Sequence, residues 1–303
     1  RTSSSFLLLS SAWWRRSTIT VGPCTWFGHM ANSIQELDDF LAQGANAIEA
    51  DVTFAPNGTA LKFYHGPGCD YGRHCENQTA IDKYLAYVKD TVSADEGKHK
   101  DKMLLLYVDI KTGNLRGDKA KYKAGVSLAE NLIHHLWSEV PSIRMVNVLL
   151  SIYSTADKEV FKGALHTLAS RDNSSDLIDH VGLDVSGTNL LSTIASMYNE
   201  LGVARHRWQG DGANNLLINV YPTFRMSFIT ARRSYDLSDQ NYVDKAYVWT
   251  ADNAFTIRRF LRHDIDGIVT NYPRNVFKVL GEQEFVSRLR FAKRRDDPWK
   301  RLS

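Results

Sequence analysis

Three acidic residues form the clearest chemical pattern in the sequence. Glu49 and Asp51 flank one alanine within an apolar run, and Asp109 lies near the end of another apolar run. Residues i and i+2 of a strand point to the same face, so Glu49 and Asp51 are expected to share one side of a strand. Neighbouring carboxylates repel each other unless a cation neutralises them or one binds a proton. Salt bridges to Lys111 and to arginines are one interpretation, but a third acid and two histidines at matching strand ends favour bound Mg²⁺, which prefers oxygen ligands.

Two histidines occupy positions comparable to those of the acids. His29 follows a glycine at the end of one apolar run, and His65 lies in a Tyr-His-Gly turn beyond the next run. A single histidine is more often a buried or surface residue than a catalyst. Two histidines beside a metal site suggest a nucleophile and a general acid for phosphoryl chemistry.

Short strand-like runs and longer amphipathic runs alternate along the chain and must position these residues. The predicted strands are 25–28, 47–52, 103–110, 146–152, 180–185, 203–208, 246–250 and 267–270. The predicted helices are 33–43, 81–92, 126–137, 158–170, 190–201, 254–262 and 276–288. Eight strands with intervening helices favour a single (β/α)8 barrel of the TIM type, in which the residues after the strands converge on one mouth. A doubly wound open sheet is the alternative, but its usual Gly-rich phosphate turn is not found.

Composition limits the class of protein and the extent of the folded domain. The chain has 303 residues, of which 43% are hydrophobic and 23% charged, and its formal net charge is +3. This balance is typical of a globular domain, and no nucleic-acid partner is expected. No uninterrupted apolar stretch of about 20 residues is present, which excludes a spanning helix. Residues 1–17 are interpreted as a signal-peptide remnant or a disordered leader, and residues 18–303 as the folded domain.

Three cysteines leave two interpretations open. Cys69 and Cys75 lie in a Gly-rich segment that can bring them within bonding distance, and Cys24 has no partner. A zinc site with His65 and His74 is the other interpretation, although the spacing of the two cysteines is unusual for zinc. A disulfide is favoured and would indicate an oxidising compartment. Sequons for N-glycosylation, which agree with secretion, begin at Asn57, Asn77 and Asn173.

Longer motifs resemble a known family. They are 28–30, 44–52, 65–75, 109–113, 181–187, 208–212, 247–252 and 266–273. Together they resemble the arachnid sphingomyelinase D toxins, which are the dermonecrotic phospholipases D of spider venoms, with relatives in ticks and mites. The resemblance runs from about Thr25 to Trp299, and residues 292–299 resemble the family's C-terminal segment that plugs the lower end of the barrel. The glycerophosphodiester phosphodiesterases share the barrel but usually have His-Arg-Gly where this chain has His29-Met30-Ala31, which favours a sphingolipid or lysolipid substrate.

The resemblance implies a role for each matching residue. It implies that His65 is the nucleophile, that His29 is the acid/base, and that Cys69 and Cys75 form a disulfide shaping the catalytic loop. It implies Mg²⁺ ligands at Glu49, Asp51 and Asp109, and substrate-binding residues at Lys111, Trp249, Asp252 and Asn271. Tyr247 and Trp249 are also candidates to hold a quaternary ammonium by cation–π contact, although aromatic residues of a barrel strand often fill the core. Many members have a further cysteine where this chain has Tyr71, so a more mobile catalytic loop is expected.

The function implied by the resemblance is that of a secreted, Mg²⁺-dependent phospholipase D. Its expected substrates are sphingomyelin, ceramide phosphoethanolamine and lysophospholipids, with attack by the substrate's own hydroxyl and release of a cyclic phosphate. A monomer that contacts the membrane peripherally, through apolar loops at the barrel mouth, and needs no protein partner is expected. The alternatives are a glycerophosphodiester phosphodiesterase and a non-catalytic relative that binds lipid.

Overall fold

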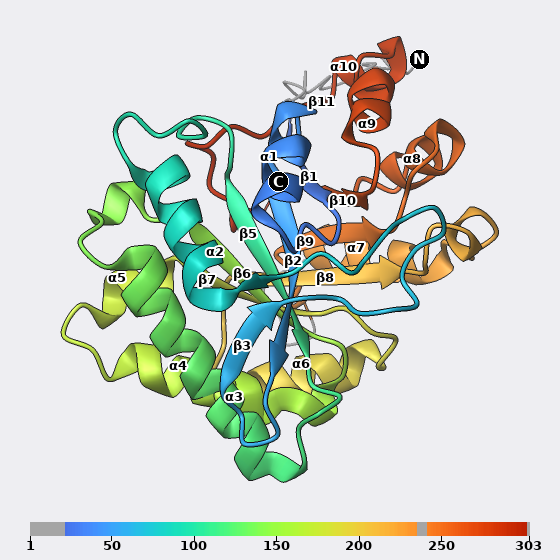
Figure 1. The fold of residues 1–303 in the computed structure, drawn as a ribbon. Coiled ribbons are helices and arrows are strands. Elements are labelled where there is room, and N and C mark those ends of the chain that lie inside the picture. The colour runs from blue at the N-terminus through green and yellow to red at the C-terminus, as the bar shows by residue number, and fades with distance from the viewer. Residues whose placement is uncertain (1–21, 235–240, 302–303) are drawn as a thin grey trace, which may run out of the picture.

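The computed structural model of the chain describes residues 22–234 and 241–301. The leader predicted at 1–17 therefore lies outside the described residues. Strands gather at the centre of the molecule and helices surround them (Figure 1). No helix in the described ranges is long and apolar enough to cross a membrane.

Eight parallel strands close into the predicted barrel. Each pairs with its neighbours in the order β1, β2, β5, β6, β7, β8, β9, β10, and β10 returns to β1. Their bounds are β1 Gly22–Gly28, β2 Ala47–Phe54, β5 Leu105–Lys111, β6 Asn147–Ile152, β7 Val181–Val185, β8 Arg207–Gly212, β9 Lys245–Trp249 and β10 Gly267–Thr270. Three short strands extend this sheet: β3 (Ala60–Phe63) and β4 (Thr79–Ala80) continue outward from β2, and β11 (Leu289–Phe291) pairs with the start of β1. The (β/α)8 fold is therefore confirmed.

Helices cover the outside of the barrel. They are α1 Ile34–Ala42, α2 Ile81–Val88, α3 Gly117–Asn131, α4 Lys158–Ala169, α5 Ser174–Asp179, α6 Leu191–Glu200, α7 Phe224–Ser234, α8 Ala254–Leu261, α9 Pro273–Leu280 and α10 Gln283–Val286. Local sequence defines several starts: Ser33 and Glu36 form a capping box at α1, and Asn253 caps α8. The π-helical segments η1 (Lys89–Ser93) and η2 (Leu132–Trp137) prolong α2 and α3, and short 3₁₀ turns are η3 (Ser142–Arg144), η4 (Thr155–Asp157) and η5 (Leu217–Asn219).

The structure differs from the predicted elements in several places. The sixth barrel strand is 207–212 and not 203–208, because two glycines that weaken the strand pattern are required inside it. A Cβ on Gly210 would lie 2.4 Å from the Tyr247 ring, and one on Gly212 would meet the backbone of Trp249. Helices α5 and α7 were not predicted at all, and the helix predicted at 126–137 begins earlier, as α3 at Gly117. The helix predicted at 276–288 is instead α9 and α10, interrupted at Gly281, and is followed by β11.

The C-terminal segment closes the lower end of the barrel, as predicted. Trp299 is buried, and its indole N–H donates to the Asp179 carbonyl at 3.1 Å. The Trp208 indole donates to the Pro298 carbonyl at the same distance. Gly182 leaves the space that the Trp299 ring occupies, since a Cβ there would lie 2.2 Å from it. The open end of the barrel is therefore the opposite one, where the strands have their carboxyl ends.

Candidate active site

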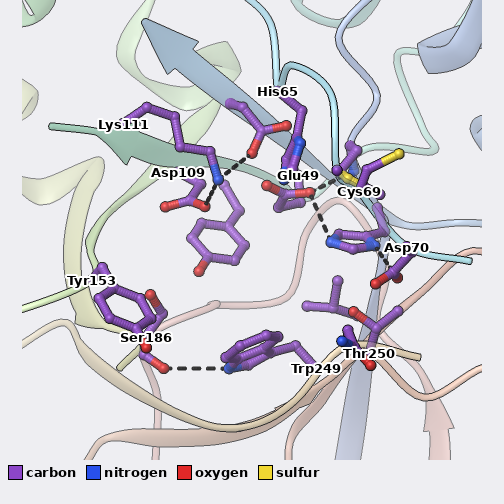
Figure 2. Close-up of a pocket in the computed structure, with 17 residues that line it drawn as sticks. Glu49, His65, Cys69, Asp70, Asp109, Lys111, Tyr153, Ser186, Trp249 and Thr250 are labelled. Atoms are coloured by element: carbon purple, nitrogen blue, oxygen red, sulfur yellow. Dashed lines mark hydrogen bonds and ion pairs between the residues drawn. The ribbon is translucent and has the colours of Figure 1, made fainter. Parts of the chain in front are cut away.

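The three predicted acidic residues meet at the carboxyl ends of two neighbouring strands. Glu49 and Asp51 lie on β2, and Asp109 lies on β5 directly opposite Asp51 in the parallel register. One carboxylate oxygen from each residue lies within 4.8 Å of the other two oxygens. Glu49 and Asp51 are buried, and Asp109 is half-buried. This acidic triad could hold a metal ion at the mouth of the barrel (Figure 2).

Negative charge is concentrated in the triad. Burial raises the pKa of Glu49, and the carboxylate of Asp51 raises it further, to about 8. Lys111 Nζ lies 2.6 Å from Asp109 Oδ2 and 2.8 Å from Asp51 Oδ1. Burial opposes ionisation of Asp51, but the contact with Lys111 outweighs it and lowers the pKa of Asp51. One ammonium group cannot neutralise three carboxylates, and a set of carboxylate oxygens suits a hard divalent cation. The residues therefore fit the predicted cofactor class.

His29 faces the triad from the end of β1. Its Nε2 lies 3.9 Å from Glu49 Oε2, and its Nδ1 lies 3.1 Å from Asp70 Oδ2. Burial lowers the pKa of His29, but the hydrogen bond to Asp70 and the charge of Glu49 outweigh this and raise it to about 9. The same contact holds the pKa of Asp70 at about 2, although burial opposes that shift. His29 is therefore a cation at neutral pH, with its second nitrogen directed at the acids.

Asp252 and Asn271 support this ion pair without lining the pocket. Asn271 Nδ2 donates to Asp70 Oδ2 and to Asp252 Oδ2, each at 2.8 Å. Asn271 Oδ1 lies 3.2 Å from His29 Nδ1. The backbone N–H of Asn271 donates to Asp252 Oδ1 at 2.7 Å. Substrate contact by both residues stays a prediction, and in this structure they hold Asp70 and His29 in place from behind.

His65 lines the pocket and precedes a loop closed by a disulfide. Cys69 and Cys75 are bonded, as favoured from the sequence, and they close the segment Cys69–Cys75, which we call the disulfide loop. His65 Nδ1 lies 3.2 Å from the Gly66 carbonyl oxygen. A carbonyl can only accept, so this contact places the hydrogen on Nδ1 and leaves a lone pair on Nε2 of the neutral ring. His65 can then act as a base or a nucleophile.

Arg73 fixes the disulfide loop against the end of β1. Its guanidinium donates to the His29 carbonyl at 3.0 Å, to Asn271 Oδ1 at 2.9 Å and to the Met30 carbonyl at 3.3 Å. These bonds connect the loop to the backbone that carries His29. Free Cys24 is buried in β1, far from this loop in the fold.

Asn215 ties the disulfide loop to the connection between β8 and α7. Tyr71 N–H donates to Asn215 Oδ1 at 3.1 Å, and Asn215 Nδ2 donates to the Tyr71 carbonyl at 3.0 Å. The same Nδ2 contacts Asp252 Oδ2 at 3.0 Å, and the Asn215 backbone N–H donates to Asp70 Oδ1 at 3.3 Å. The position where a further cysteine was expected in relatives is thus held by hydrogen bonds in this chain.

The opposite wall of the pocket is aromatic. Tyr153, Ser186 and Trp249 face the acidic side across a cavity of about 250 Å³ (Figure 2). The Trp249 indole donates to the Ser186 carbonyl at 3.3 Å, which fixes the ring. Tyr247, which was also a candidate for substrate contact, lies beneath the pocket and does not line it. Its hydroxyl donates to the buried Asp184 at 2.7 Å, so it belongs to the core of the barrel.

Several residues of the site were missed by sequence reasoning. Asp70, Arg73 and Asn215 lie in loops, where no strand or helix period indicates which way a side chain points. Tyr107 had a signal that was not used, because it lies two residues before Asp109 on β5 and therefore shares its face. Tyr107 also lines the pocket.

Comparison with known sequences gives the family. The model of the family described as "Dermonecrotic toxin SPH" matches residues 22–299. Dermonecrotic toxin SPH of Ixodes scapularis is 43% identical over 275 residues, which are 91% of this chain and 75% of that protein. Dermonecrotic toxin StSicTox-betaIC1 of Sicarius terrosus is 35% identical over 274 residues, covering 90% of this chain and 99% of the toxin.

Solved structures show a similar barrel at low sequence identity. A glycerophosphodiester phosphodiesterase from Parabacteroides distasonis has a TM-score of 0.55 and 14% identity, covering 86% of this chain and 98% of that one. A phosphodiesterase of Oleispira antarctica, in complex with sn-glycerol-3-phosphate, has a TM-score of 0.50 and 13% identity, covering 85% and 97%. These likenesses concern the fold alone. The sequence matches, together with the acidic triad and two histidines at one barrel mouth, show that the chain belongs to the dermonecrotic toxin family of phospholipase D-type enzymes.

Proposed function

We propose that this enzyme is a secreted, Mg²⁺-dependent phospholipase D that releases the head group of sphingomyelin, ceramide phosphoethanolamine and lysophospholipids. The observation that carries the proposal is that His29 and His65 line one cavity with the acidic triad. A phosphodiester needs groups that neutralise its oxygens, a base or nucleophile on one side and an acid for the leaving group. This pocket contains a candidate for each role.

Bound at Glu49, Asp51 and Asp109, Mg²⁺ would supply charge that polarises the phosphodiester and stabilises its developing negative charge. Lys111 adds a second cation beside the same oxygens, because its Nζ contacts two of the three acids. Its pKa is raised, since the carboxylates of Asp109 and Asp51 outweigh the effect of burial, so it keeps its charge throughout the accessible pH range.

The two histidines have different environments, which supports different roles. His65 Nε2 would take the proton of the substrate's free hydroxyl as that oxygen attacks phosphorus. The bond from phosphorus to the head-group oxygen then breaks, and His29, protonated because its pKa is raised to about 9, would give its proton to the departing alcohol. The products are the free head group and a cyclic phosphate. Attack by the substrate's own hydroxyl requires no water, so a substrate that lacks a free hydroxyl would not react this way.

The aromatic wall supports recognition of the head group. Trp249 and Tyr153 line the side of the cavity opposite the triad. A quaternary ammonium against an aromatic face gains about 0.5–2 kcal/mol. Secretion agrees with the Cys69–Cys75 disulfide, which requires an oxidising compartment. A monomer in peripheral contact with a membrane, without a protein or nucleic-acid partner, completes the proposal.

Product analysis by phosphorus NMR tests the proposal directly. Sphingomyelin, ceramide phosphoethanolamine and lysophosphatidylcholine are incubated in parallel with the enzyme and with His29→Ala. The expected result is a cyclic phosphate signal and free head group from the native enzyme, and neither from His29→Ala, whose fold is checked by circular dichroism. A phosphomonoester as the first product would contradict attack by the internal hydroxyl, and unchanged activity of His29→Ala would contradict the site.

Glycerophosphodiester hydrolysis is a second candidate, favoured by the likeness of the barrel to phosphodiesterases of that class. Against it, the residue after His29 is Met30, which is buried and lines the pocket without a charge. Turnover of glycerophosphocholine well above that of sphingomyelin would support this second function over the first.

A further inference from the structure

One side of the barrel mouth carries large apolar side chains that point into solvent. Leu190 lies just before α6, and the β8–α7 connection together with the first turns of α7 carries the others. Their exposed fractions run from 56% for Leu216 to 81% for Val220. We call this surface the α7 rim, and its residues are Leu190, Leu216, Leu217, Val220, Phe224 and Phe228.

The exposure of the α7 rim is not needed to pack the segment on the barrel. The core side of the same segment is filled by Ile218, Met226 and Ile229, which are fully buried. Helix α7 therefore has apolar residues toward the barrel and again, at Phe224 and Phe228, toward solvent. Contiguous exposed apolar patches are uncommon on soluble monomers and mark surfaces that bind a partner or a membrane. The outer apolar side of α7 is therefore expected to contact a second apolar surface.

The α7 rim adjoins the catalytic pocket at two points. Asn214, which lines the pocket, begins the segment that carries Leu216 and Leu217. Ser186 lines the pocket on the other side, and the chain reaches Leu190 four residues later. A surface bound at the α7 rim would therefore lie beside the opening through which a substrate enters.

A second cavity, of about 570 Å³, opens within this rim. Leu190 and Leu191 form one side of it, and Phe224 and Phe228 form the other. Arg225 and Arg232 are the charged residues that line it within the described ranges, and Arg225 Nε also lies 3.3 Å from Asp211 Oδ1. An apolar cavity edged by guanidinium groups complements a phospholipid, whose acyl chain is apolar and whose phosphate is anionic.

We propose that the α7 rim is the surface by which this protein docks on a phosphatidylcholine–sphingomyelin bilayer, with its cavity taking up an acyl chain. The inference rests on the proposed function for its choice of a lipid surface, and it adds that docking is one-sided. The β7–β8 side of the mouth enters the bilayer interface, while the β2–β5 side, which carries the acidic triad, stays above it. The phosphate of a neighbouring lipid then reaches the pocket from the aromatic wall.

Vesicle binding without turnover tests the proposal. The His29→Ala protein, with and without Phe224→Ser/Phe228→Ser, is sedimented with phosphatidylcholine–sphingomyelin vesicles. Ile143→Ser/Val286→Ser is the matched control, because both residues are exposed and apolar but lie away from the mouth. We expect the rim variant to lose roughly tenfold or more in partition coefficient, given the apolar area of two phenylalanines, and the control to bind as its parent does. Equal binding by the rim variant would overturn the proposal even if lipid cleavage is established, whereas loss of cleavage alone would leave it standing.

A fluorescent label gives the orientation. The native cysteines are either bonded or buried, so a cysteine placed at the surface can be labelled selectively. An environment-sensitive dye on Phe228→Cys should shift its emission to the blue when vesicles are added, and the same dye on Ile143→Cys should not. A dimer in solution that dissociates in the rim variant, with no vesicle binding by the parent, would assign the surface to a second copy of the chain and overturn the inference.

Discussion

The two sides of the barrel mouth are built on different principles. On the β1–β2–β5 side, Glu49 and Asp109 project from strands and His29 follows the end of β1, and charge and hydrogen bonds fix all three. On the β6–β9 side, Tyr153 and Ser186 follow strand ends, and the α7 rim beyond them is apolar and exposed. The comparison indicates that the regular backbone of two strands places the acidic triad, whereas a connection and the helix that follows it place most of the exposed apolar residues of the α7 rim.

The largest expected effect on activity comes from the acidic triad, on the β1–β2–β5 side of the mouth. Glu49→Gln keeps the shape of the side chain but removes a carboxylate from the triad. We expect head-group release to fall by about 10³-fold or more, as when a metal ion and its charge stabilisation are lost. Mg²⁺ binding, followed by titration calorimetry, should weaken in the same variant. The melting temperature should stay level or rise, because burial and Asp51 already disfavour the charged form of Glu49. A variant with normal Mg²⁺ affinity would contradict the proposed ligand set.

The next effect concerns the ion pair behind His29. Asp70→Asn removes the charge that raises the pKa of His29 to about 9. An acid must hold its proton to act, so lowering this pKa should move the alkaline limb of the rate–pH profile to lower pH, with a rate loss of about 10–100-fold at neutral pH. The profile of kcat is the measurement. A drop in rate without movement of the alkaline limb would show that Asp70 positions the loop but does not raise the pKa of His29.

A smaller effect is expected where the two sides are joined. Asn215→Ala removes three contacts that connect the disulfide loop to the β8–α7 connection and to Asp252. We expect the rate to fall about tenfold, since each lost hydrogen bond contributes roughly 1 kcal/mol and the loop would sample more positions. Amide exchange at Tyr71 should accelerate in parallel. Asn219→Ala, a change in the same connection that leaves those three contacts in place, is the control and should leave exchange at Tyr71 as in the native enzyme.

The smallest effect is expected on the aromatic side. Trp249→Leu removes the ring that lines the pocket, and we expect KM for choline lipids to rise by about three- to tenfold more than KM for ethanolamine lipids. Tyr247→Phe is the comparison, because the Tyr247 ring lies below the pocket and its hydroxyl serves Asp184. That variant should lower thermal stability and leave the ratio between the two head groups unchanged. A changed ratio would mean that Tyr247 contacts substrate after all.

Sequence reasoning found the site residues that lie on strands and missed several that lie in loops. Glu49, Asp51 and Asp109 could be brought together because strand period and parallel register determine which side chains share a face. His65 and the disulfide were proposed from the residues themselves, and the family resemblance added the role of each. Asp70, Arg73 and Asn215 could not be found, because their directions depend on long-range contacts of the disulfide loop and no local period encodes them. The bounds of β8 were predicted wrongly because Gly210 and Gly212 weaken the sequence pattern of a strand. Both glycines are needed where β8 packs closely against β9. Tyr247 was predicted to contact substrate because the sequence does not indicate how deep inside the barrel a strand residue lies.

The Cys69–Cys75 disulfide constrains the segment that contacts His29. Two residues between the bonded cysteines contact His29. Asp70 pairs with its ring, and Arg73 donates a hydrogen bond to its carbonyl. A covalent bond that closes so short a segment restricts the conformations of everything inside it. Breaking the Cys69–Cys75 bond is therefore expected to loosen Asp70 and Arg73 beside His29, while the acidic triad on β2 and β5 keeps its place.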